Sequence, residues 1–233
     1  MTEVDWFEAR APGRLVFHVE NMGSERKLRL FAVACCHPIE RLLIDARSRA
    51  ALATLETYSD GGCGLAELDN CFSQAKEAVD AIESSLYGDD GILETNAESM
   101  AACAVMRAVN PNITPTRNDN FAHSAISSVA IYASGAAASV VFKRAGTPSP
   151  EVDAVEKAQK LGQVHLLHDI FGNPFSRRPT ITPSLLTPSI TALAHDIYNR
   201  RDFSRLGEAA DLLAKGPEHG PIPALPEPTD LSA

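Results

Sequence analysis

The stretch FAHSAISSVAIYASGAAASVVF, residues 121–142, decides the fold expected for this 233-residue chain. It runs for 22 residues without Asp, Glu, Lys or Arg, and most of its side chains are small, with many alanines and five serines. As an α-helix it would be about 33 Å long, close to the diameter of a small domain. A helix that is apolar or small on every side is normally buried, and small side chains let neighbouring backbones approach. We therefore expect residues 121–142 to form the central, buried helix of an α-helical domain.

The same stretch is long enough to span a membrane. Its composition argues against that, because His123 and the serines dilute its hydrophobicity and leucine is absent. Basic residues flank it on both sides (Arg117 before it, Lys143 and Arg144 after it), so no charge asymmetry would orient a span. The sequence predicts a helix of a soluble protein that has no membrane partner.

The overall charge limits the classes of molecule that the chain is expected to bind. The chain has 21 basic and 30 acidic residues, a formal net charge of -9, and 45% of its residues are hydrophobic. Such a chain is repelled by nucleic acid unless a local basic patch overrides the total. Two short clusters of arginine, at 177–178 and 200–205, are interpreted as solvated faces, so we expect no nucleic-acid partner.

The N-terminal segment and the cysteines indicate the compartment. An export signal begins with basic residues that are followed by an apolar stretch, whereas this N-terminal segment carries the acidic residues Glu3, Asp5 and Glu8. The chain has five cysteines, and an odd number cannot all pair within one chain, which argues against a disulfide framework. The sequence therefore predicts a cytoplasmic protein.

Helical periodicity and punctuation by Gly, Pro and capping residues predict further helices on both sides of the central stretch. A helix that starts after Ser24 should kink or restart at Pro38. Ser149 followed by Pro150 is a strong helix-start signal. The remaining helices are expected at 47–58, 65–86, 94–109, 150–171, 188–200 and 203–214.

The domain organisation follows from these elements. Residues 1–23 are expected to form a short helix and an irregular connector, residues 24–215 a single α-helical domain, and residues 216–233, with five prolines, an extended or disordered tail. No run alternates apolar and polar residues over the length of a strand pair, and the best β candidate is the short piece 15–18. The predicted fold class is all-α, a bundle of seven to nine helices around residues 121–142.

Three stretches resemble a family of uncharacterised bacterial proteins that is abundant in planctomycetes. They are RKLRLFAVACCHPIERLLIDARSRAAL at 26–52, LLHDIFGNPF at 166–175 and LTPSITALAHDIYNRRDFSRL at 186–206. The chain departs from the family pattern at His37-Pro38, where basic residues are usual, and at His168, where arginine is usual. The resemblance implies a mostly helical protein and brings no known activity, cofactor or catalytic residue.

Cysteines and histidines are the candidates for metal or thiol chemistry. Cys35 and Cys36 are adjacent, so on a helix they point about 100° apart and do not readily bind one ion together. His165 and His168 share a helix face at i, i+3, and His195 would be a further donor from another helix. No C-x-x-C and no H-E-x-x-H occurs, so buried packing of the cysteines and surface placement of the histidines are the simpler interpretations.

The sequence Gly172-Asn173-Pro174-Phe175 ends a predicted helix. Phe171 and Phe175 beside it either pack back on the bundle or present an apolar contact to a partner, and the first interpretation is favoured.

These patterns favour a non-enzymatic interaction or scaffold module without a cofactor, because no catalytic constellation stands out while apolar helical faces are plentiful. An apolar face left over after folding would form a homo-oligomer or bind a partner helix. The alternative is a metal- or thiol-dependent protein that uses Cys35, Cys36, His165 and His168.

Overall fold

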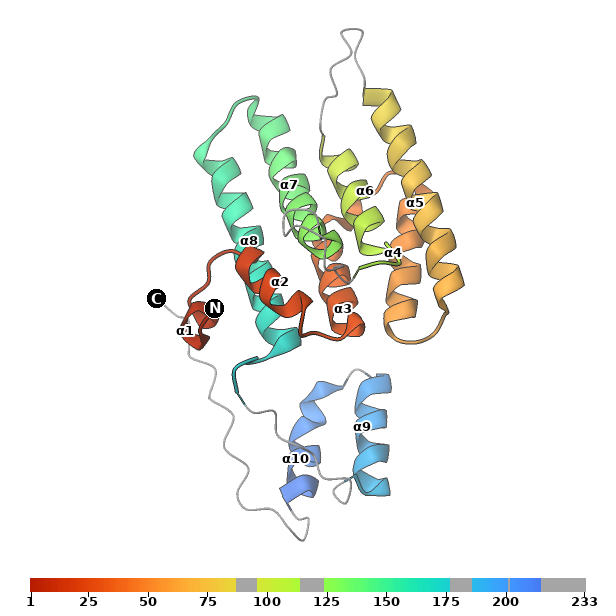
Figure 1. Ribbon diagram of the computed structural model, residues 1–233, viewed down its shortest axis with the longest axis vertical. Coiled ribbons are helices and arrows are strands. Elements are labelled where there is room, and N and C mark those ends of the chain that lie inside the picture. The colour runs from red at the N-terminus through yellow and green to blue at the C-terminus, as the bar shows by residue number, and fades with distance from the viewer. Residues whose placement is uncertain (87–95, 114–123, 177–185, 201, 215–233) are drawn as a thin grey trace. The chain divides into compact units, whose positions relative to one another are not determined.

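The computed structural model describes residues 1–86, 96–113, 124–176, 186–200 and 202–214. Every regular element in these ranges is a helix, which confirms the predicted all-α class (Figure 1). The chain divides into two compact units, residues 1–176 and 177–233. The range 24–215 extends across this boundary, so its unity as one domain stays a prediction, and the predicted tail lies outside the described residues.

The first unit contains eight α-helices within its described residues. They are α1 (Glu3–Phe7), α2 (Gly13–Glu20), α3 (Glu25–Cys36), α4 (Ala46–Ser59), α5 (Leu65–Leu86), α6 (Ala97–Ala108), α7 (Ala125–Ala145) and α8 (Pro150–Phe171). Between α3 and α4 the chain forms a 3-10 helix, η1 (His37–Leu42), with Pro38 in its first turn, where the sequence predicts a kink or restart. Proline suits this position because the first turn of a helix does not need its missing N–H.

Helix α2 occupies part of the stretch expected to be an irregular connector. Pro12 is its N-cap residue, with φ of -73°, and Gly13 is its first residue. A proline at the start of a helix favours the helical φ and costs no hydrogen bond. The apolar residues 15–18, the best β candidate, therefore lie on a helix, and α2 is the helix that the sequence prediction lacks.

Helix α7 is the central element of the first unit. It contacts α2, α3, α6, α8 and η1, and its contact with α6 is the most extensive between any two helices there. Its first turn is capped by Ser124, whose Oγ accepts a hydrogen bond from Ser127 N at 3.1 Å. It ends at Gly146, which has φ of 72°, a left-handed conformation that glycine adopts without strain. Residues 121–123 of the predicted helix lie outside the described residues.

Burial of α7 is one-sided, which corrects the expectation of a helix buried all round. Ile126, Val129 and Ala136 are fully buried, whereas Ile131 is 60% exposed and Phe142 is 44% exposed. By length and composition α7 is the one described helix that could cross a membrane, and half of its most apolar window is buried inside the unit. A bundle needs only one face of a helix for its core, so two large apolar side chains of the other face, Ile131 and Phe142, remain at the surface.

Arg29 of α3 is fully buried and holds the C-terminal end of α6. Its Nη1 donates to the carbonyl oxygens of Ala108 at 2.9 Å and Asn110 at 2.7 Å, and its Nη2 donates to that of Pro111 at 3.0 Å. Glu25 balances its charge, with an Oε1 to Nη2 distance of 3.0 Å. Burial lowers the pKa of Arg29, and the hydrogen bond that Arg29 donates to the Glu25 carboxylate opposes that shift. The guanidinium satisfies carbonyl groups that the end of a helix leaves without partners.

The second unit contains α9 (Pro188–Arg200), the 3-10 helix η4 (Phe203–Arg205) and α10 (Leu206–Ala214) among its described residues. Asp196 of α9 pairs with Arg200 at 2.7 Å and with Arg205 at 2.6 Å, and Arg205 also pairs with Glu208 at 2.9 Å. The arginines at 200 and 205, interpreted from sequence as solvated, thus form an ion-pair network that joins the two helices.

Candidate functional site

A trough of about 580 Å³ runs between α7 and α8. These two helices lie side by side in Figure 1, and α2 lies beside the end where α7 begins. Most of the groups that line the trough are small or apolar. On α7 they are Ser127, Ala130, Ile131, Ser134, Gly135, Ala138, Ser139 and Phe142; on α8 they are Val152, Glu156, Lys160 and Gln163; residues 11–13, Val16 and Met100 complete the lining.

The lining residues of α7 recur every three or four positions from Ser127 to Phe142. This is the spacing of one helix face, and 15 steps of about 1.5 Å give a length of about 22 Å. Residues of α8 from Val152 to Gln163 recur in the same way. The site is therefore an elongated channel about four helical turns long.

Small residues on the α7 side of the trough allow another backbone to approach α7 closely. A Cβ atom built on Gly135 would lie 2.4 Å from the Met100 Cε of α6, so the missing side chain leaves space that the tip of Met100 already occupies. Ser139 Oγ donates to the same Met100 Sδ at 3.4 Å. Ile131 and Phe142 are the large apolar side chains of α7 that stay exposed along the channel.

Gln163 supplies a buried polar group at the end of the trough near α2. It is only 3% exposed, and its Nε2 donates to Ala130 O at 2.9 Å and to Ser134 Oγ at 3.0 Å. Its Oε1 has no hydrogen-bond partner among the described residues. A buried acceptor without a donor costs about 1–3 kcal/mol, so a guest that brings a donor to this point would recover part of that cost.

The mouth of the trough is polar. Lys160 Nζ and Glu156 Oε1 are 2.5 Å apart, one helical turn from each other on α8. Both side chains are about two-fifths exposed. The rim of the trough therefore carries one positive and one negative group that are accessible to solvent.

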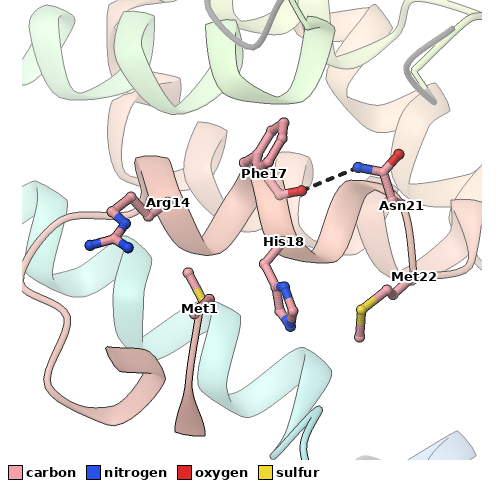
Figure 2. A pocket seen from close by; sticks show the side chains of 6 residues that line it. All are labelled: Met1, Arg14, Phe17, His18, Asn21 and Met22. Carbon is pink, nitrogen blue, oxygen red and sulfur yellow. Dashed lines mark hydrogen bonds between the residues drawn. The ribbon is translucent and has the colours of Figure 1, made fainter. Parts of the chain in front are cut away.

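A second hollow, of about 590 Å³, lies beside the N-terminus of the first unit. Figure 2 shows its lining, in which Met1, His18 and Met22 lie on one side of α2 and Phe17 lies on the other. Asn21 Nδ2 donates to the carbonyl oxygen of Phe17 at 3.4 Å, which holds the end of α2. Burial lowers the pKa of His18, and therefore the imidazole stays neutral near pH 7.

The two phenylalanines predicted as interaction residues differ in their surroundings. Phe171 is 8% exposed and packs against Gly23, with Lys27 Nζ 5.4 Å from its ring centroid, so it belongs to the core. Phe175 is 37% exposed and stacks on His18, with ring centroids 5.0 Å apart and planes inclined by 9°. An interaction role is thus accessible to Phe175 only, and it stays a prediction.

The histidines predicted as metal candidates have different roles in the first unit. His168 Nε2 lies 3.0 Å from the carbonyl oxygen of Trp6, which requires the proton on Nε2 and ties α8 to α1. Its ring also lies 5.3 Å from that of Trp6. His165 is exposed one turn away, and His195 belongs to the second unit. The contact between this fully buried tryptophan and His168 was not predicted from the sequence, because 162 positions separate the two residues.

The cysteines remain free thiols. Cys35 and Cys36 are buried in the core, and burial raises the pKa of Cys36 to about 12 and that of Cys35 well above its usual value. A thiol with so high a pKa is protonated at neutral pH and is a poor nucleophile. Within the part of the chain that the structure describes, no three His, Cys, Asp or Glu residues converge as metal ligands would. The metal- or thiol-dependent alternative stays a prediction, which elemental analysis of the purified protein would test.

No family model matches this chain, and comparisons with curated proteins and with solved structures give no match. The resemblance to the planctomycete family therefore also stays a prediction, and functional inference has to proceed from the geometry of the trough.

Proposed function

We propose that this protein is a non-enzymatic cytoplasmic interaction module that docks one amphipathic helix of a protein partner in the trough between α7 and α8. The observation that carries the proposal is the one-sided burial of α7, which leaves Ile131 and Phe142 exposed along a channel lined by small residues. Apolar side chains that stay at the surface of a groove are typical of helix-binding sites.

The shape of the trough favours a helix over a compact ligand. Its lining repeats at helical spacing over about four turns on α7 and about three turns on α8, so an inserted helix would meet an equivalent contact at each turn. Serine, alanine and glycine on the α7 wall allow close approach of a second backbone. The apolar side chains of the guest would cover Ile131 and Phe142, and its polar side would face the Glu156–Lys160 rim.

The partner is expected to carry a hydrogen-bond donor where it reaches Gln163. The amide oxygen there is buried and unpartnered among the described residues. A serine, threonine or asparagine side chain, or the free N–H groups of a helix N-terminus, would satisfy it. The net charge of -9 supports a proposal that involves neither nucleic acid nor membrane.

The test is site-specific photo-cross-linking in the native cell. A photoreactive phenylalanine analogue replaces Phe142 in one variant and Ile44, which is 62% exposed and outside the trough, in the control. We expect a discrete protein adduct only from position 142, with the cross-linked peptide mapping to an amphipathic helix.

The yield of this adduct should depend on the exposed apolar side chains of α7 that line the trough. Adding Ile131→Asp should reduce its yield at least about tenfold, the loss expected when a central apolar contact of a docking site is replaced by a charge. Leu65→Asp, at a position that is 57% exposed on α5, should leave the yield unchanged. Equal adducts from positions 142 and 44, or indifference to Ile131→Asp, would contradict the proposal.

A further inference from the structure

Two cysteines converge on one residue at the turn between α4 and α5. Cys63 lies in the turn and Cys71 in the second turn of α5. Cys63 Sγ lies 3.7 Å from the carbonyl oxygen of Thr54, and Cys71 Sγ lies 3.3 Å from the Oγ1 of the same threonine. The two thiols therefore both contact one residue of α4, Cys63 through its backbone carbonyl group and Cys71 through its side chain, although the sequence holds no C-x-x-C spacing.

Their accessibility separates them from the other cysteines. Cys35, Cys36 and Cys103 are buried, whereas Cys63 and Cys71 are half-buried. Reagents and small oxidants therefore reach two of the five thiols in the folded protein. Oxidation is selective for accessible thiols, so chemistry should concentrate at this pair.

The turn has the freedom to bring the two sulfur atoms together. Gly61, Gly62 and Gly64 surround Cys63, and Gly61 has φ of 77°, in the left-handed region. A disulfide removes the S–H that Cys63 donates to the Thr54 carbonyl oxygen and needs the two Cα atoms within about 7 Å, so any movement it requires falls on this turn. Glycines on both sides lower the barrier to this movement, because they tolerate backbone conformations closed to other residues.

We propose that Cys63 and Cys71 are a reversible oxidation site that closes an intramolecular disulfide with a low-molecular-weight disulfide, such as oxidised glutathione, as the oxidant. One cysteine thiolate attacks the small disulfide, forms a mixed disulfide and releases one glutathione thiolate. The second cysteine thiolate then attacks the protein sulfur and releases the other. Two S–H bonds are lost, one S–S bond forms in the protein, and the small disulfide is reduced to two thiols.

The surroundings of Cys63 set the pH dependence of this reaction. Burial raises the pKa of its thiol, and the neighbouring Glu67 and Cys71 raise it further. The thiolate is the reactive form, so the rate of oxidation should increase as the pH rises above neutrality. Thiol reduction should reverse the reaction.

The test uses the full chain, reduced and then incubated with oxidised glutathione at mildly alkaline pH. In the reduced folded protein a thiol reagent should label two of five thiols, and after oxidation none. The intact mass should fall by about 2 Da, the two hydrogens lost in forming one disulfide. Proteolysis should yield one peptide pair that links Cys63 to Cys71 and separates on reduction.

Two matched variants locate the reaction. Cys63→Ser and Cys71→Ser should each stop at a stable mixed disulfide with one glutathione, while Cys103→Ser should oxidise like the wild-type chain. Two glutathione adducts on the wild-type chain without a Cys63–Cys71 link would overturn the proposal. So would a 2 Da loss that persists in Cys63→Ser. Peptide mapping of the wild-type chain decides the question even for a variant that folds poorly.

Discussion

Replacing Arg29 with methionine is expected to lower the free energy of unfolding by about 3–5 kcal/mol, because three hydrogen bonds from a charged donor are lost, each contributing about 1.5–3 kcal/mol, and burial of methionine offsets only part of that loss. The guanidinium donates to three carbonyl oxygens at the end of α6 and pairs with Glu25. Methionine fills a similar volume but donates no hydrogen bond, so the buried carbonyl group of Ala108 and the partly buried ones of Asn110 and Pro111 lose their donor. Urea denaturation followed by circular dichroism measures the loss.

Two controls separate the carbonyl contacts from the ion pair. Arg29→Lys keeps the charge but cannot donate to three separate carbonyl groups, so it should lose a substantial part of the same free energy. Glu25→Gln should cost about 1 kcal/mol or less, because the Glu25 side chain is 45% exposed and such pairs contribute little. A loss below about 1 kcal/mol for Arg29→Met would show that the carbonyl groups do not depend on this side chain.

Replacing Ala136 with aspartate is expected to cost at least about 3 kcal/mol and to leave much of the chain unfolded. Ala136 is 0% exposed on the core side of α7, so the carboxylate would be buried without a partner or forced to take up a proton. Both thermal and urea unfolding should report the loss.

Ile131→Asp is the matched control in the same helix. Ile131 is 60% exposed, so its aspartate stays in water and the cost should be about 1 kcal/mol or less. Because alanine is a better helix former than isoleucine, helix propensity accounts for up to about 0.5 kcal/mol of the difference between the variants, and any larger difference reports burial. Equal losses would mean that the two faces of α7 have the same environment.

Much of the fold was predictable from local patterns. The signal Ser149-Pro150 predicts a helix that the structure begins at Pro150, and the predicted helix 65–86 has the observed bounds of α5. These features depend on residues close in sequence, namely caps, prolines and apolar periodicity. Helix α2 was not predicted because the segment that holds Pro12 and Gly13 was expected to be an irregular connector, although a proline at a helix start stabilises the helix.

The candidate site was less predictable because it depends on long-range contacts. The small residues of α7 give no amphipathic pattern, so composition alone could not show which face α6 and α8 would cover. Gln163 looks like an ordinary polar residue of α8 until Ala130 and Ser134 are brought beside it. Likewise, Arg29 and the carbonyl groups that it caps are about 80 positions apart in the chain.

The signals that could have been used were polar residues next to the apolar positions of a helix face. Gln163 stands beside Val164 and one turn before Leu167, and Arg29 stands between Leu28 and Phe31, all of them buried. A polar side chain at such a position needs a partner, so each one marks a place where another segment must supply hydrogen-bonding groups.

The central claim is that α7 belongs to the core on one side and forms an open wall of the trough on the other. Hydroxyl-radical footprinting of the free protein in detergent-free buffer tests it directly, because Ile126 and Ile131 have the same intrinsic reactivity but are 0% and 60% exposed. We predict that Ile131 is oxidised several-fold faster than Ile126, as their difference in accessibility requires. Oxidation of Ile126 at the rate of Ile131, or protection of both, would contradict the account.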